Sequence, residues 1–147
     1  MIPFLVAIIA LAPGTLPDHH LTPGSTLPVT HKQVCSAGYS KMARKQLFPR
    51  TAVYRRYKLK NTPGAYEVDH LISIELGGSN DVTNLWPQSY STVWNAHVKD
   101  QLENELHREV CHNRISLLTA QTEIRTNWVR SYQLHFHRST PRPVKRK

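Results

Sequence analysis

The chain is 147 residues long, carries a net charge of +9 at neutral pH and is 39% hydrophobic. A chain of this length forms one domain with a modest core, which argues against a multidomain architecture. The charge is uneven, because residues 31–60 hold nine Lys or Arg and no acid, whereas residues 67–123 hold nine of the ten acids. A basic region beside an acidic centre suits a polyanionic substrate with a metal site, although charge alone fits a soluble cationic protein equally well.

The first twelve residues form an apolar run that is too short to cross a bilayer, for which about 20 residues are needed. We interpret residues 1–14 as a secretory signal peptide, which places the mature protein in the periplasm or outside the cell. The run has no Lys or Arg before its apolar core and is followed directly by Pro13, so a buried N-terminal strand is the alternative. Residues 15–30 are rich in Pro and Gly and are expected to form an extended linker.

The middle of the chain has the composition of short elements joined by turns. Residues 51–57 predict a short helix. Residues 66–74 are rich in β-branched and aromatic side chains, which predicts a strand that bends after His70. A Gly-Gly turn at residues 77–80 then leads into a second short strand, predicted for residues 82–86.

Two helices are predicted in the second half of the chain. The first runs from about Thr92 to Cys111, because apolar residues recur every four positions. These are Trp94, Val98, Leu102, Leu106 and Val110. The second begins after Ser116, a good N-cap, and runs to about Tyr132. Its expected inward residues are Leu117, Ala120, Ile124 and Trp128. The basic tail at 135–147 is expected to be disordered, and the sequence contains no internal repeat or transmembrane span.

The two cysteines, Cys35 and Cys111, are too far apart in sequence to form a CxxC zinc clip. In an exported protein they would pair and join the N-terminal arm to the helical half. In a cytosolic protein they would remain two thiols.

Residues 66–85 carry the most specific motif of the chain. Asp69 and His70 lie side by side at the end of an apolar run, and Asn84 follows the glycine turn. A carboxylate suits Mg²⁺ or Mn²⁺, a neutral imidazole can take a proton from water, and an amide can bridge backbone groups of a loop. Read singly, these residues would be a surface acid, a surface histidine and a turn residue.

In combination, the motif resembles the HNH endonuclease family over residues 66–105, and the flanks at 17–65 and 106–133 resemble a small secreted branch of that family. The resemblance implies an α+β fold in which a ββα-metal finger has flanking helices and an extended N-terminal arm, with the nuclease domain at 31–134. It also implies an endonuclease that hydrolyses phosphodiester bonds in DNA with low sequence specificity. The expected cofactor is one divalent metal ion, Mg²⁺ with Mn²⁺ as a possibility, and RNA is a possible second substrate.

By the same resemblance, Asp69 is a metal ligand, His70 is the general base and Asn84 fixes the orientation of His70. The family places a further metal-binding His or Asn on the helix about ten residues past the middle Asn, and here this sequence departs from the pattern. Asn95 and His97 are the candidates, but residues two apart on a helix point about 200° apart, so we expect only one of them to face the motif. We favour Asn95, in the first helical turn.

Basic residues are expected to bind the sugar-phosphate backbone of the nucleic acid. Those expected to do so are Arg44, Lys45, Arg55 and Arg56, just before the motif, and Lys99, which is expected to clamp a substrate phosphate. A solvated basic surface is the alternative.

Two other functions stay open at this point. One is a non-catalytic nucleic-acid-binding protein that retains the finger as a scaffold. The other is a nuclease toxin that an immunity partner neutralises.

Overall fold

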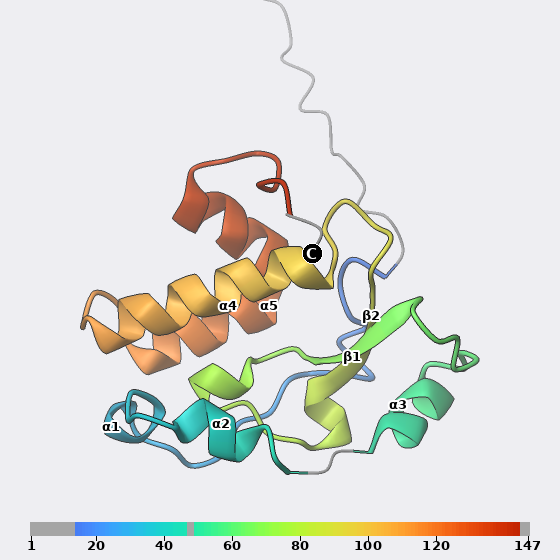
Figure 1. The fold of residues 1–147 in the computed structure, drawn as a ribbon, viewed down its shortest axis with the longest axis horizontal. Coiled ribbons are helices and arrows are strands. Elements are labelled where there is room, and N and C mark those ends of the chain that lie inside the picture. The colour runs from blue at the N-terminus through green and yellow to red at the C-terminus, as the bar shows by residue number, and fades with distance from the viewer. Residues whose placement is uncertain (1–13, 47–48, 145–147) are drawn as a thin grey trace, which may run out of the picture.

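The structure is a computed structural model, which describes residues 14–46 and 49–144. Within these residues it has an α+β fold, as predicted, with five α-helices and one two-stranded antiparallel sheet (Figure 1). The α-helices are α1 (His31–Val34), α2 (Tyr39–Ala43), α3 (Arg50–Arg56), α4 (Ala96–Cys111) and α5 (Leu117–Phe136). The strands are β1 (Tyr66–His70) and β2 (Leu85–Ser89), and two 3₁₀ turns, η1 (Ile74–Leu76) and η2 (Val82–Asn84), lie between them.

The Pro- and Gly-rich segment before α1, expected to be an extended linker, is packed against the domain. The buried residue Thr15 accepts a hydrogen bond through its carbonyl from Trp128 Nε1 at 2.8 Å. The hydroxyl of Thr22, also buried, donates to the carbonyl of Leu85 at 2.9 Å. Extended backbone leaves its own polar groups unpaired, and here Trp128 in the core supplies a partner for the carbonyl of Thr15. The expected signal peptide falls almost entirely at residues 1–13, which lie outside the described residues.

Strands β1 and β2 pair with Asp69 opposite Trp86 and His70 opposite Leu85. The first strand ends at His70, where the sequence predicts a bend. The second strand begins three residues later than predicted, because Asp81 Oδ1 accepts a hydrogen bond from Thr83 N at 2.9 Å and starts the η2 turn. A short polar side chain that bonds its own neighbouring backbone competes with strand formation.

The main core lies between α4 and α5, which run side by side in Figure 1. All five residues of the predicted apolar stripe on the first helix are buried, as are Ala120, Ile124 and Trp128 of the second. The rings of Trp94 and Trp128 meet edge to face with centroids 6.1 Å apart, an arrangement that aromatic pairs favour. Helix α4 begins at Ala96, four residues later than predicted, because Asn95 Oδ1 caps it by accepting from Val98 N at 3.1 Å.

Helix α5 contains one non-helical residue, Asn127, and extends four residues beyond the predicted end, after which the chain folds back. The backbone N–H of Arg142 donates to Tyr132 Oη at 3.0 Å, and its guanidinium lies 4.6 Å from the ring centroid of Phe136. The tail, expected to be disordered, is therefore held against α5 as far as Val144. Within the described residues, no helix is long and apolar enough to cross a membrane.

A disulfide joins Cys35, at the end of α1, to Cys111, at the end of α4. The predicted pairing is thus present, and the bond links the N-terminal arm to the helical half of the chain. It closes a loop with a sequence separation of 76 residues. In the chain-entropy description, a loop of that length stabilises the fold by about 4 kcal/mol.

Candidate active site

A polar hollow of about 520 Å³ opens beside the end of β1. Strand β1, helix α4 and the segments around η1 and α3 supply its walls. The polar side chains that line it include Arg44, Arg50, Glu67, Asp69, His70, Ser73, Tyr90, Asp100 and Glu103. Below, these residues and the volume that they enclose are called the polar hollow.

The alternation of side chains along β1 sorts the motif onto two faces of the strand. Glu67 and Asp69 share the face that carries the ion pair to α4, whereas Val68 and His70 share the opposite, more buried face. Asp69 Oδ2 lies 2.8 Å from Lys99 Nζ. The strand therefore joins a carboxylate bound to α4 and a buried imidazole at consecutive positions.

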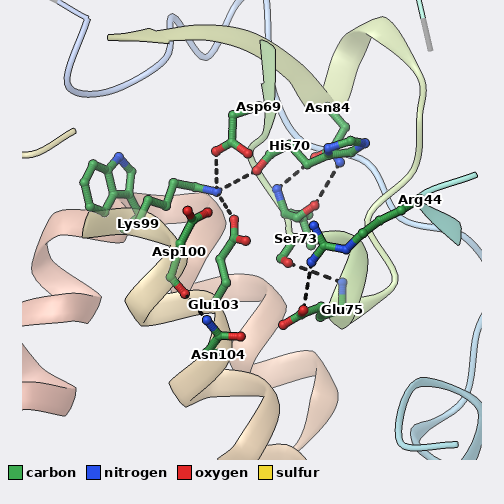
Figure 2. Close-up of polar contacts among 12 residues, drawn as sticks. Arg44, Asp69, His70, Ser73, Glu75, Asn84, Lys99, Asp100, Glu103 and Asn104 are labelled. Atoms are coloured by element: carbon green, nitrogen blue, oxygen red, sulfur yellow. Dashed lines mark hydrogen bonds and ion pairs between the residues drawn. The ribbon is translucent and has the colours of Figure 1, made fainter. Parts of the chain in front are cut away.

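Lys99 is fully buried and holds three oxygen atoms together (Figure 2). Its ammonium donates to the carbonyl of His70 at 2.7 Å and to the carboxylates of Asp69 and Glu103. Burial alone would lower the pKa of Lys99, but the two carboxylates outweigh burial and raise it. The expectation that Lys99 clamps a substrate phosphate is corrected here, because its charge is enclosed behind Asp69 and is fully engaged by protein groups.

Carboxyl groups exceed ammonium groups in the inner part of the polar hollow. Glu67, Asp69, Asp100 and Glu103 all line it, and Lys99 is bound to two of them. Burial, followed by the charge of Asp69, raises the pKa of Glu67 and of Asp100, and burial raises the pKa of Glu103. Uncompensated negative charge of this kind is relieved by protonation or by a bound cation.

His70 is 7% exposed, and its ring is oriented by Asn80. Its Nε2 lies 2.7 Å from Asn80 Oδ1, and the amide nitrogen of Asn80 donates to Gln46 Oε1 at 3.3 Å. Because an amide oxygen only accepts, Nε2 is the donor nitrogen and Nδ1 is the acceptor of the neutral ring. Burial lowers the pKa of His70, although Asn80 and Asp69 oppose the effect, so the ring is neutral at pH 7.

Asn84, fully buried, ties together the loop that follows His70 (Figure 2). Its Oδ1 accepts from Ile72 N at 3.0 Å, and its Nδ2 donates to the carbonyls of Ile72 and Ser79, both at 3.0 Å. Its own carbonyl accepts from Leu71 N at 2.8 Å. The backbone that carries His70 is therefore fixed by a side chain with both of its amide groups engaged.

Gly78 makes this close packing possible. A Cβ atom at this position would lie 1.7 Å from the carbonyl oxygen of Ile72 and 2.9 Å from Asn84 Nδ2. Neither distance is compatible with a side chain. Glycine at this position is thus required by the approach of the Asn84 loop and is not merely a flexible turn residue.

Asn95 and His97, the residues expected to compete for the third metal position, are not brought to the polar hollow. Both line a neighbouring hollow with Tyr90 and residues 141–144. The side-chain oxygen of Asn95 is used as the N-cap of α4. His97 contacts two residues that line the polar hollow, Asp100, whose Oδ2 lies 3.9 Å from His97 Nδ1, and Tyr90, whose ring centroid lies 5.1 Å from that of His97. The residues that α4 turns toward Asp69 are Lys99, Asp100 and Glu103 (Figure 2).

Three of the basic residues expected to bind nucleic acid, Arg44, Lys45 and Arg55, lie at the rim. Arg44 lines the polar hollow and pairs with Glu75 at 2.8 Å. Lys45 and Arg55 line an adjoining hollow, which shares Arg44 and Arg50 with the first. Arg56 is exposed and donates to the carbonyl of Leu21 at 2.6 Å. A band of cations thus borders the acidic interior. It consists of Arg44, Lys45, Arg50 and Arg55 and is called the basic rim below.

Two residues of the site, Glu103 and Asn80, were not identified from the sequence. The spacing of Lys99 and Glu103, four residues apart on one helix, is a signal that could have pointed to the first. Asn80 carries no comparable signal, because it is a turn residue whose contact with His70 depends on the folded loop.

The donor set of the polar hollow fits a hard divalent cation. Asp69, Asp100 and Glu67 offer carboxylate oxygens, the ligands that Mg²⁺ and Mn²⁺ prefer, and their mutual repulsion would be relieved by a cation. His70, whose imidazole is neutral, also lines this hollow. The arrangement can therefore bind a metal ion and accept a proton at one site. In comparisons with known proteins, no protein family, no curated protein and no solved structure matches this chain.

Proposed function

We propose that this chain is a metal-dependent endonuclease of the HNH type that hydrolyses phosphodiester bonds in DNA with low sequence specificity. The observation that carries the proposal is a buried, neutral imidazole at His70, which follows Asp69 directly at the edge of an acidic hollow with a basic rim. Strands β1 and β2 and helix α4 supply this site, and we assign them to the ββα-metal finger.

Asp69, with Asp100 and Glu67, would hold the metal ion, for which Mg²⁺ is the first candidate and Mn²⁺ the second. When bound, such an ion stabilises negative charge that develops on phosphate oxygens. Asp100 replaces Asn95 and His97 as our candidate for the ligand from the helix, because it lines the same hollow as Asp69. Lys99 fixes the carboxylate of Asp69 through their ion pair. The three proposed ligands, Asp69, Asp100 and Glu67, together still carry more negative charge than Lys99 neutralises.

His70 is the general base of the proposed reaction. Its neutral imidazole takes a proton from the attacking water, while the contact of Nε2 with Asn80 orients the ring. Asn84 and Gly78 hold the backbone of the loop, and with it the imidazole, in one position relative to Asp69. A general base contributes roughly 10²–10⁴-fold to a rate, provided that its geometry is fixed.

The basic rim would bind the substrate through its phosphates. Arg44 and Arg50 border both hollows, so a polyanion that follows the rim passes the entrance of the polar hollow. Contacts of this kind release counterions and do not read base edges, which accounts for low sequence specificity. RNA would satisfy the same contacts and is a second possible substrate.

The disulfide supports an exported protein, secreted or periplasmic, since such bonds persist in oxidising compartments. One feature favours a second candidate function, a non-catalytic nucleic-acid-binding protein. The ammonium of Lys99 already neutralises part of the charge of Asp69, and a chain that binds DNA without a metal ion would use the same contact as a scaffold.

The test is the nicking of supercoiled plasmid by the purified protein, with Mg²⁺ or Mn²⁺ and with a chelator. We expect nicking that requires the ion. We also expect Asp69→Asn to lose activity while Glu105→Gln, a change to an acid elsewhere on α4, keeps it. Plasmid that is retarded in a gel but never cut, with any of the ions, would favour the non-catalytic protein instead.

A further inference from the structure

The disulfide is flanked on both sides by a histidine that stands one helical turn before each cysteine. His31 precedes Cys35 by four residues, and His107 precedes Cys111 by four residues. His31 Nε2 lies 3.8 Å from Cys35 Sγ, and His107 Nε2 lies 3.5 Å from Cys111 Sγ. The first pair belongs to α1 and its C-cap, and the second pair belongs to α4.

The two imidazoles are also anchored across the junction in the same manner. His31 Nε2 lies 2.9 Å from the carbonyl oxygen of Val110, the residue before Cys111. His107 Nε2 lies 2.9 Å from the carbonyl oxygen of Val34, the residue before Cys35. Each helix therefore sends a histidine to the other helix beside its cysteine. The ring of His107 stays close to both sulfur atoms, and that of His31 lies beside Cys35.

This set of atoms has the composition of a structural zinc site. The two sulfur atoms and a ring nitrogen of His107 all lie within 4.8 Å of one another. Two thiolates and two imidazoles are a common tetrahedral ligand set for zinc, with Zn–S bonds of about 2.3 Å and Zn–N bonds of about 2.0 Å. Two thiolates on such an ion are about 3.8 Å apart. Cysteines with Cα atoms 5.5 Å apart reach that separation by side-chain rotation.

We infer that the reduced chain binds a zinc ion through Cys35, Cys111, His107 and His31, and that the ion then holds α1 against α4 in place of the disulfide. A phosphine reductant supplies the two electrons that break the S–S bond. It becomes the phosphine oxide, while water provides the oxygen and the two protons that make two thiols. Zinc then displaces the thiol protons. The proton of each imidazole moves from Nε2 to Nδ1, and Nε2 exchanges its hydrogen bond to the backbone carbonyl for a bond to the ion.

The inference is independent of the proposed nuclease, because this cluster is formed by the far ends of α1 and α4 and shares no residue with the polar hollow. It gives the chain two alternative cross-links at one junction. A chain that has not been oxidised would be closed by the metal ion, and an oxidised chain is closed by the disulfide.

Cobalt(II) titration of the full chain, reduced with a phosphine under anaerobic conditions, tests the site. A tetrahedral site with thiolate ligands gives intense visible absorption and a thiolate-to-cobalt charge-transfer band, which a carboxylate site cannot give. We expect both signals to saturate at one ion per chain, to disappear when Zn²⁺ is added, and to be absent from the oxidised protein. A reduced chain without the charge-transfer band would overturn the inference.

The histidine variants separate a built site from two adventitious thiols. His107→Ala and His31→Ala keep the disulfide, so their folding is checked by circular dichroism before reduction. Loss of an outer-shell partner already costs 10–100-fold in metal affinity, so loss of either ligand should weaken binding at least about tenfold. His112→Ala, next to Cys111 in sequence but bonded to the carbonyl of Arg108, is the matched control and should bind as the parent does. Parent affinity in the His107→Ala variant would contradict the assignment.

Reduction itself could loosen the fold, and that result is informative too. If the near-ultraviolet circular dichroism of the parent falls on reduction, we expect Zn²⁺ to restore it. A reduced chain that stays unfolded at saturating Zn²⁺ would contradict the claim that the ion replaces the disulfide.

Discussion

At the scale of single residues, His70 shows how burial prepares a base. The imidazole is enclosed by the loop that Asn84 holds, and this burial lowers its pKa despite the contact with Asn80. A lowered pKa means that the neutral, proton-accepting form persists to a lower pH than in an ordinary histidine. The consequence for activity can be measured directly.

The rate of plasmid cleavage should rise with pH as His70 loses its proton and should reach its plateau at lower pH than an unperturbed imidazole allows. The midpoint should therefore lie below about 6.5, the ordinary value for histidine. The measurement is kcat/KM against pH at saturating Mg²⁺. A midpoint above that value would show that another group, or a histidine in a solvated environment, limits the reaction.

Lys99 is a second residue whose environment determines its role. Because it is fully buried between Asp69 and Glu103, its removal leaves buried charge without a partner. Lys99→Met should lower the free energy of unfolding by about 3–5 kcal/mol, and Lys99→Met combined with Glu103→Leu should recover part of that loss. Urea denaturation of the two variants checks this.

The matched control is Arg108→Met on the same helix, which breaks the surface pair with Glu105. Such exposed pairs contribute about 1 kcal/mol or less. If Lys99→Met proved no more destabilising than this control, the buried network would not be the structural centre of the site.

At the scale of elements, the loop between β1 and β2 positions the motif, and Gly78 is its most constrained residue. A methyl group there would meet the carbonyl of Ile72 and the amide of Asn84. Gly78→Ala should therefore unfold the protein or displace the loop and abolish activity, as monitored by thermal denaturation and plasmid nicking. Gly38→Ala is the control, because Gly38 has a positive φ of 84° but open space around it.

The two substitutions differ in the kind of cost that they impose. Gly38→Ala should lower the free energy of unfolding by about 1–2 kcal/mol, because alanine is strained in a left-handed backbone conformation. Activity should be retained at low temperature. A Gly78→Ala variant that matched it in both stability and activity would show that the loop can rearrange around Asn84.

The elements also show what sequence patterns can and cannot predict. The apolar stripe from Trp94 to Val110 predicted α4 and its buried face, because helical periodicity is a local property. The starts of α4 and β2 were misplaced, because side-chain caps from Asn95 and Asp81 decide them. Such caps are visible in sequence only as common polar residues, so boundaries are less predictable than the elements themselves.

The candidate site was predictable to the same limited extent. Asp69, His70 and Asn84 belong to one short segment, so their order along the chain signalled the motif. Asp100 and Glu103 join them only because the folded chain brings α4 against β1, a contact between elements that sequence spacing does not encode. The expected ligands Asn95 and His97 line a neighbouring hollow for this reason, since the packing of α4 decides which of its residues face β1.

At the scale of the whole molecule, the disulfide and the core between α4 and α5 hold the N-terminal arm in place. The Cys35→Ser/Cys111→Ser variant should lose about 4 kcal/mol of unfolding free energy, by the loop-entropy estimate. Urea denaturation with Zn²⁺ removed by a chelator checks this value. A loss well below 1 kcal/mol would show that packing alone fixes the arm.

The charge distribution is the second property of the whole molecule. A basic rim borders an acidic interior, so substrate affinity and chemistry are assigned to different residues. Changes to the interior should alter the rate of cleavage with little effect on binding. This separation makes the central claim open to one decisive measurement.

That measurement is plasmid cleavage by His70→Ala, run beside DNA binding by the same protein and by the control His112→Ala. The account predicts that His70→Ala loses roughly 10²–10⁴-fold in cleavage rate, keeps near-parental DNA affinity and remains folded, whereas His112→Ala cleaves at the parental rate. Cleavage by the His70→Ala protein at the parental rate would contradict the assignment of His70 as the base and, with it, the proposed nuclease site.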